Sequence, residues 1–215
     1  MRERKCIFKM IIDKIIKINK TEKRVKNEKA SDMLIGKWIK CDKCKEILYK
    51  EDVHKNFSVC PNCGKHFRIS ARRRIKQIAD EGSFEEIGAG ILTKDPLKFE
   101  GYLKKVEALK EKTKIEEAVK CGICKIYGEE AVIAVMDGNF MMGSMGEVVG
   151  ERITLAVETS IKKRLPLIIF CVSGGARMQE GIISLMQMAK TSAALAKHNK
   201  EGLLYISVLT DPTTG

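Results

Sequence analysis

Two Cys-x-x-Cys pairs constrain the fold of this chain more than any other feature. Fifteen residues separate the pair Cys41 and Cys44 from the pair Cys60 and Cys63, which is the spacing of a structural zinc site with four thiolate ligands. Each pair can form a turn that presents two sulfurs to one ion, and Gly64 supplies the permissive backbone that such a turn often needs. The sequence therefore predicts a small module held together by one metal ion.

Disulfide bonds are the main alternative for these cysteines. Eight cysteines in 215 residues is well below the density of a disulfide scaffold. The apolar stretch from Ile7 to Ile18 is interrupted by four charged side chains, unlike a signal peptide. We therefore expect a reducing, cytoplasmic location, where paired cysteines favour metal over cystine. His54 and His66 are expected at the surface, because four thiolates already complete a closed site.

The basic charge of the chain is concentrated in its first 80 residues. They carry 23 Lys and Arg against 10 Asp and Glu, whereas residues 81–215 carry 17 against 18. Residues 1–35 form either a basic amphipathic helix that contacts a membrane or a partner, or a marginal helix followed by a solvated linker. No segment reaches the apolar length of a membrane span, so no transmembrane segment is expected.

From residue 118 onward, apolar runs alternate with helical patterns. The expected strands cover residues 119–127, 131–136, 167–172 and 203–209, and the expected helices cover residues 71–79, 103–112, 148–163 and 179–198. Residues 83–100 are expected to be irregular. Strands that are apolar on both faces indicate a layered α/β core. The chain divides into a basic extension (1–35), a zinc module (36–70) and an α/β domain (71–215). Such a core normally continues with another covering helix, so we expect a C-terminal truncation.

The sequence places Ser173-Gly174-Gly175 between an expected strand and an expected helix, a position where backbone amides can contact a ligand. Glycines let the backbone pass close to a ligand, and two amides at the start of a helix can hold the developing oxyanion of a thioester enolate. The alternative is a tight turn in which glycine serves packing only, and the spacing alone does not decide between them. The loop from Met142 to Gly146 likewise forms either a pocket wall or a helix-entry turn.

The remaining cysteines and serines in the α/β domain do not form a recognisable metal or catalytic site. Cys121 and Cys124 lie in an expected strand, where residues three apart point to opposite faces, so joint metal binding is not expected. Ser144 and Ser173 have no histidine base close by in the sequence, which argues against a serine hydrolase.

Taken together, these residues resemble the β subunit family of the bacterial and plastid acetyl-CoA carboxylase carboxyltransferase. The resemblance covers about residues 36–215. The matching stretches are Trp38-Ile-Lys-Cys41, Cys60-Pro-Asn-Cys63-Gly64-Lys-His-Phe-Arg-Ile, Met136-Asp137, Gly143-Ser-Met-Gly146, Ser173-Gly-Gly-Ala-Arg-Met-Gln-Glu-Gly181 and Tyr205-Ile-Ser-Val-Leu-Thr-Asp-Pro-Thr-Thr-Gly215.

The resemblance implies a fold, a reaction and partners. The fold is a crotonase-like core of β-β-α units behind an N-terminal zinc ribbon with one structural zinc ion. The reaction passes a carboxyl group from carboxybiotin to acetyl-CoA and gives malonyl-CoA, the first committed step of fatty acid synthesis. The biotin belongs to a separate biotin carboxyl carrier protein and is not bound covalently to this chain. An α subunit completes the active site, in an α2β2 assembly.

The resemblance also implies roles for particular residues. The backbone amides of Gly174 and Gly175 would form the oxyanion hole. The expected substrate contacts are Gly143, Ser144, Met145, Gly146 and Arg177. The chain departs from the family pattern at Gly138, Met142 and Glu147, all in one loop, which leaves the geometry of that loop open.

Two other functions remain as alternatives at this stage. One is a zinc-ribbon protein that binds nucleic acid, based on the basic front end and on the aromatic residues Trp38, Tyr49, Phe57 and Phe67. The other is a different acyl-CoA enzyme of the same fold, such as a hydratase. A hydratase needs a paired acid and base, and Glu147, Glu151 and Glu180 show no such arrangement in the sequence.

Overall fold

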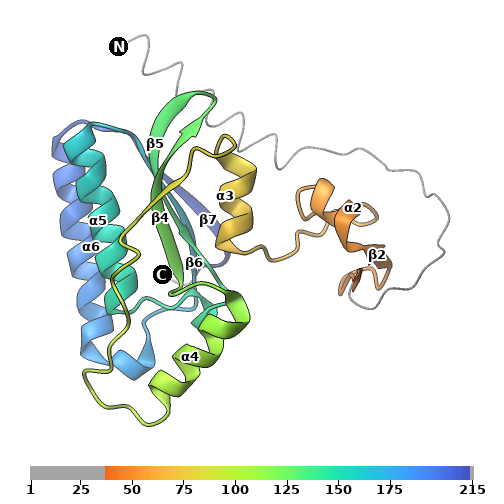
Figure 1. Ribbon diagram of the computed structural model, residues 1–215, viewed down its shortest axis with the longest axis horizontal. Helices are drawn as coiled ribbons and strands as arrows, with labels where there is room; N and C mark the ends of the chain where they lie inside the picture. Colours follow the sequence, from red (N-terminus) through yellow and green to blue (C-terminus); the bar gives the residue numbers. More distant parts are fainter. Residues whose placement is uncertain (1–36, 214–215) are drawn as a thin grey trace. The chain divides into compact units, whose positions relative to one another are not determined.

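The computed structural model describes residues 37–213, and the chain divides into two compact units at Ile69 and Ser70 (Figure 1). The amphipathic helix predicted within residues 1–35 lies outside the described residues. None of the described helices is both long enough and apolar enough to cross a membrane.

The described part of the first unit is a small antiparallel hairpin with one short helix. Strands β1 (Trp38–Lys40) and β2 (Ile47–Tyr49) pair, and α2 (Lys50–Lys55) follows directly. Trp38 and Tyr49 pack edge to face across the hairpin, with ring centroids 5.5 Å apart. His54 and His66 are exposed, as expected. The short α2 was not predicted.

A five-stranded mixed sheet forms the centre of the second unit, in the order β3-β4-β5-β6-β7. The strands are β3 (Glu85–Ile87), β4 (Val119–Ile126), β5 (Glu129–Met136), β6 (Leu167–Ser173) and β7 (Tyr205–Thr213). The helices are α3 (Ala71–Ile78), α4 (Tyr102–Thr113), α5 (Glu147–Lys163) and α6 (Ile182–Lys200), with short 3₁₀ turns η1 (Met141–Gly143) and η2 (Met178–Glu180).

Local sequence explains the connections between these strands. Tyr127 and Gly128 join β4 to β5 and have positive φ angles of 55° and 84°, the geometry of a tight type I′ hairpin turn. The pairs β5/β6 and β6/β7 are parallel, so each needs a helical crossover, which α5 and α6 provide.

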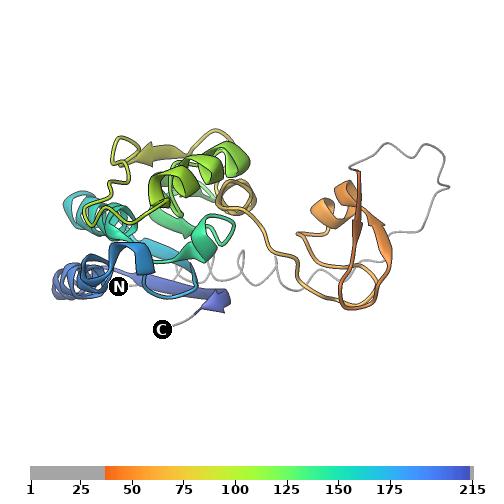
Figure 2. The ribbon, with the colours of Figure 1, turned by 90° about the horizontal axis from the view of Figure 1, so that it is seen from below.

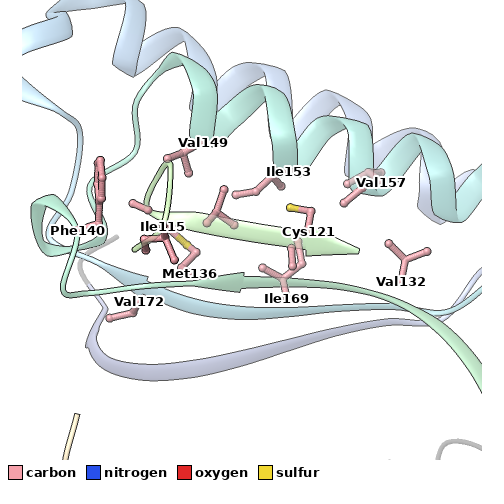
Figure 3. Close-up of a cluster of buried hydrophobic side chains, with 14 of the residues drawn as sticks. Ile115, Cys121, Val132, Met136, Phe140, Val149, Ile153, Val157, Ile169 and Val172 are labelled. Atoms are coloured by element: carbon pink, nitrogen blue, oxygen red, sulfur yellow. The ribbon is translucent and has the colours of Figure 1, made fainter. Parts of the chain in front are cut away.

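Helices cover both faces of the sheet. α5 and α6 lie side by side on one face, and α3 lies on the opposite face (Figures 1 and 2). Val149, Ile153 and Val157 of α5 pack onto side chains of β4, β5 and β6 (Figure 3). Fully buried β4 and β5 side chains such as Val119 and Ala134 confirm the apolar core that the sequence predicts.

Three expectations require correction. The strand predicted at 203–209 to be buried is instead an edge strand of alternating exposure, with Leu209 72% exposed. The region 83–100 is not wholly irregular, because β3 pairs there with β4. The last helix begins at Ile182 rather than at residue 179, because η2 and the positive φ of Gly181 intervene.

Candidate functional site

The four cysteines of the first unit form one cluster. Their ligand sulfurs all lie within 4.8 Å of one another, and the sulfur pairs Cys41–Cys63 and Cys44–Cys60 are each 3.7 Å apart. A tetrahedral zinc site with Zn–S bonds of about 2.3 Å places its sulfurs about 3.8 Å apart. A disulfide would require about 2.05 Å. The spacing therefore fits a structural zinc ion held by four thiolates.

The two cysteine pairs are built by matching backbone turns. In the first turn the Lys45 amide donates to the Cys41 carbonyl oxygen at 2.8 Å, and in the second the Gly64 amide donates to the Cys60 carbonyl oxygen at 3.0 Å. Lys45 and Gly64 have φ angles of 64° and 68°. The permissive backbone expected at Gly64 is thus present, and Lys45 adopts the same left-handed conformation without being glycine.

In the second unit, two loops meet at the carboxyl edge of the parallel strands. The first loop, residues 137–146, follows β5, and the second loop, residues 174–181, follows β6. A parallel bridge joins Met145 to Ala176, and the Met145 amide donates to the Gly175 carbonyl oxygen at 2.9 Å. Open parallel sheets bind ligands at this edge. These two loops therefore form the candidate site.

A buried ion pair connects the two loops. The side chains of Arg177 and Glu117 are 0% and 1% exposed, and two guanidinium nitrogens lie 2.7 and 2.8 Å from the two carboxylate oxygens. The guanidinium also contacts the Tyr102 hydroxyl at 3.1 Å, the hydroxyl and carbonyl oxygens of Ser144 at 3.2 and 3.0 Å, and a carboxylate oxygen of Glu180 at 3.5 Å. The pair thus links the second loop to the first loop, to α4 and to the segment before β4.

The charges in this ion pair stabilise each other. Burial alone would lower the pKa of Arg177, but the hydrogen bond and charge of Glu117 raise it. Burial alone would raise the pKa of Glu117, but Arg177 lowers it below its usual value. Burial also raises the pKa of Tyr102, so its hydroxyl remains protonated and can donate to the adjoining carboxylate.

Glu180 adds a second buried carboxylate to the cluster. One of its oxygens accepts from the Tyr102 hydroxyl at 2.5 Å, and the other accepts from the amide of Glu147 at the start of α5. The helix dipole stabilises negative charge there. A Cβ atom on Gly146 would lie 2.7 Å from the Glu180 Oε1 atom. Glycine at this position therefore allows the carboxylate to reach the helix.

The structure changes the role expected for several predicted substrate contacts. Every contact of the buried Arg177 guanidinium described above is to a protein group, so in this structure Arg177 holds the two loops together. Gly143, Ser144 and Gly146 are also buried, and Met145 is half-buried. A Cβ atom on Gly143 would lie 2.3 Å from the Val172 carbonyl oxygen, so close packing against β6 requires a glycine there.

The two amides predicted to form an oxyanion hole already have acceptors. The Gly174 amide donates to the Met142 carbonyl oxygen at 2.9 Å, and the Gly175 amide donates to the Ser173 hydroxyl at 3.0 Å. The expected pair of free amides is therefore not present in this conformation. The two acceptors differ, because a hydroxyl can rotate away, whereas the Met142 carbonyl belongs to a backbone held by its neighbours.

Serine hydrolase chemistry finds no support in this geometry. Ser144 accepts from Arg177 and not from an imidazole. The imidazole of His198 lies 2.8 Å from the Ser160 hydroxyl, between α5 and α6, and burial lowers its pKa. Cys121 and Cys124 are both buried, in keeping with the packing role predicted for them.

The chain matches two families of known domains, the carboxyl transferase domain over residues 64–215 and the acetyl-CoA carboxylase zinc finger domain over residues 38–63. The acetyl-coenzyme A carboxylase carboxyl transferase subunit beta of Clostridium botulinum (strain Hall) is 55% identical over 212 residues, which cover 97% of this chain and 73% of that protein. The chain belongs to the acetyl-CoA carboxylase carboxyltransferase β subunit family.

Two further similarities support this carboxyltransferase assignment. A Natranaerobius thermophilus protein named as carboxyl transferase subunits beta/alpha is 58% identical over 180 residues, which cover 84% of this chain and 30% of that protein. The solved transcarboxylase 12S core with methylmalonyl-coenzyme A and methylmalonic acid bound is 30% identical, with a TM-score of 0.57 over 66% of this chain and 26% of that chain. The crotonase-like fold behind a zinc ribbon is thereby confirmed, and the nucleic-acid and hydratase alternatives are not favoured.

Sequence reasoning missed the residues that hold the carboxyltransferase loops in place. Glu117 and Tyr102 contact Arg177 although 60 and 75 residues separate them from it along the chain. Nothing in the sequence distinguishes the buried Glu117 from its exposed neighbour Glu116, so the sequence pattern gives no signal that could have identified it.

Proposed function

We propose that this chain supplies the acyl-CoA side of a carboxyltransferase that converts acetyl-CoA to malonyl-CoA, the committed step of fatty acid synthesis. The observation that supports the proposal is the pair of loops, residues 137–146 and 174–181, that are bridged at the carboxyl edge of the sheet. The accessible turn Ser173–Gly174–Gly175 lies at the start of the second loop. Gly174 is exposed and Gly175 is half-buried, so a thioester can approach both glycines.

In the proposed reaction the Gly175 amide donates to the thioester oxygen. The oxygen replaces the Ser173 hydroxyl, which leaves by rotation about its Cα–Cβ bond. As the acetyl methyl loses its proton, negative charge develops on that oxygen, and one well-placed amide contributes about 3–4 kcal/mol to such a transition state. The Gly174 amide keeps its hydrogen bond to the Met142 carbonyl oxygen and so fixes the position of the turn.

Carboxybiotin on a carrier protein would supply CO2 by breaking its bond between the ring nitrogen and the carboxyl carbon, and the freed nitrogen would accept the methyl proton. The enolate carbon then forms the new bond to the CO2 carbon. This chain therefore requires no acid–base pair of its own, in keeping with the buried and engaged states of Glu117 and Glu180. Its residues bind and orient the thioester and stabilise the enolate.

Partners and zinc follow from the same proposal. We propose that an α subunit completes the site in an α2β2 assembly and that a biotin carboxyl carrier protein delivers the biotin. The β/α relative, in which both subunits share one chain, supports such a partnership. Cys41, Cys44, Cys60 and Cys63 would hold one structural zinc in a ribbon spanning residues 36–70, with the carboxyltransferase domain at residues 71–215.

The proposal is tested by reconstitution. The chain is co-expressed with the α subunit of its own genome, loaded with zinc, and assayed for malonyl-CoA-dependent carboxylation of free biotin. We expect turnover that neither subunit shows alone. A stable complex without turnover would contradict the proposal. If the chain also bound nucleic acid tightly at physiological salt, with a steep salt dependence, the nucleic-acid alternative would be preferred.

A further inference from the structure

We propose that Met142 limits the size of the acyl group accepted at the Ser173–Gly174–Gly175 turn, so that short acyl thioesters are preferred. This inference rests on the proposed function and names the acyl-size determinant of the same site.

Met142 stands out from its neighbours by its exposure. It is 58% exposed, whereas Phe140 is fully buried and Gly143 and Ser144 are buried. Its side chain is thus directed away from the core, at the rim of the first loop. Burial of apolar surface therefore does not explain why a methionine stands there.

The residue contacts Gly174 with both its backbone and its side chain. The Met142 carbonyl oxygen accepts from the Gly174 amide at 2.9 Å. A Cβ atom placed on Gly174 would lie 3.2 Å from the Met142 Cβ atom and 3.6 Å from its Cε atom. The whole side chain, from its first to its last carbon, therefore runs alongside the glycine turn.

The backbone conformation gives no other reason for a methionine. Met142 has φ and ψ angles of 57° and 25°, in the left-handed region that residues with a side chain adopt at a cost in free energy. Glycine would avoid that cost. The contact with Gly174 is thus the remaining feature that a methionine supplies and a glycine does not.

The segment around Met142 is held too firmly to move away from an acyl group. On one side, the Gly143 amide donates to the carbonyl oxygen of the buried Phe140 at 2.8 Å. The close approach of Gly143 to the Val172 carbonyl oxygen pins the backbone to β6. On the other side, the buried guanidinium of Arg177 holds Ser144. Only the side chain of Met142 is left to adapt.

A fixed backbone with an apolar side chain at its rim would act as a wall beside the bound acyl group. Since Met142 flanks Gly174, the residue before Gly175, an acetyl group bound to the Gly175 amide would have its methyl near this wall, and each added methylene would bring the acyl chain closer to the thioether. One methylene changes specificity by about 10–200-fold in hydrophobic sites. Methionine is flexible and can partly yield, so we expect an effect near the lower end of that range.

The test compares acyl chain lengths in the reconstituted α–β complex. The ratio of kcat/KM for butyryl-CoA to that for acetyl-CoA is measured for wild type, Met142→Ala, Met142→Gly and the control Met186→Ala. Met186 is also 58% exposed but lies on α6. We expect the ratio to rise about tenfold in both Met142 variants and to stay unchanged in the control.

The two Met142 variants separate side-chain size from backbone freedom. Alanine removes the wall but keeps the left-handed strain, whereas glycine removes both. A ratio that rises only in Met142→Gly would overturn the proposal, because backbone freedom would then be the cause. An unchanged ratio, or an equal loss with both thioesters in variants that still bind the α subunit, would also overturn it. A wild-type complex inactive on every thioester would instead refute the proposed function itself.

Discussion

Replacing Arg177 by methionine should destabilise the second unit strongly. The change removes a guanidinium that is fully buried. The Glu117 carboxylate, 1% exposed, loses the two hydrogen bonds of 2.7 and 2.8 Å that Arg177 donates, and keeps two neutral donors, the Thr93 hydroxyl and the Ala118 amide. The change also removes the hydrogen bonds that the Ser144 carbonyl oxygen and the Tyr102 hydroxyl oxygen accept from Arg177. Removal of one partner of a buried pair costs about 3–5 kcal/mol, a large part of the roughly 5–15 kcal/mol that holds a typical domain folded.

An exposed ion pair in the same unit provides the matched control. Arg164 and Glu201 lie 3.2 Å apart, with side chains 56% and 48% exposed, and such pairs contribute about 0–1 kcal/mol. Arg164→Met should therefore change stability very little. The comparison separates burial from the mere presence of an Arg–Glu contact.

The assay is urea unfolding followed by far-UV circular dichroism. Tryptophan fluorescence is unsuitable, since the single tryptophan, Trp38, lies in the first unit. We expect Arg177→Met to lose about 3–5 kcal/mol of unfolding free energy and about 6–20 °C in Tm. The double variant with Glu117→Leu should recover part of the loss, because it removes the Glu117 charge, while the buried Glu180 carboxylate loses its ion pair with Arg177 but keeps the Tyr102 hydroxyl and the Glu147 amide as donors. Equal small losses for Arg177→Met and Arg164→Met would refute this reasoning.

Four further predictions follow from the two units. The lowered pKa of Glu117 stabilises the fold above its unfolded pKa of about 4.5, and this contribution is lost as the pH falls through the lower folded pKa. Urea unfolding at a series of pH values should therefore show the advantage of wild type over Glu117→Gln shrinking as the pH falls below the unfolded pKa and through the lower folded pKa, and a constant difference would count against it. Gly146→Ala introduces a Cβ atom 2.7 Å from a buried carboxylate oxygen and should cost about 1–3 kcal/mol in urea unfolding, whereas Gly90→Ala, with open space around its Cβ, should cost far less; equal losses would show that the crowding is relieved. Cys60→Ser, or prolonged chelation, should reduce bound zinc from about one ion per chain to near zero by elemental analysis, and retention of zinc would point to other ligands. Ser173→Ala removes the hydroxyl that competes for the oxyanion amide and should lower the KM for acetyl-CoA roughly two- to tenfold, while an unchanged KM would mean that the hydroxyl does not compete.

Much of the fold could be predicted because it follows from local sequence. The apolar runs before and after Gly128 give β4 and β5, and the helical spacing after residue 147 gives α5. The zinc site was also predictable, since Cys-x-x-Cys spacing fixes two ligands per turn. β3 escaped prediction because three residues carry too little pattern, and its pairing depends on β4.

The candidate site was harder to predict because it depends on contacts between distant segments. The sequence reveals that Arg177 is charged, but not that Glu117 and Tyr102 enclose it. It shows two glycines after a strand, but not that the Met142 carbonyl already accepts from the first of them. Hydrogen-bond partners of backbone amides are a property of packed loops, so only the structure distinguishes a free amide from an engaged one.

The most direct test of the account follows the Gly175 amide itself. The chain is labelled with ¹⁵N-glycine, assembled with its α subunit and titrated with acetyl-CoA or with CoA lacking the acyl group. We expect the Gly175 amide proton to shift downfield with acetyl-CoA and to stay in place with CoA, because only the thioester supplies the oxygen. A Gly175 resonance that is unmoved by saturating acetyl-CoA, in a complex that turns over, would contradict the assignment of the oxyanion site to this turn.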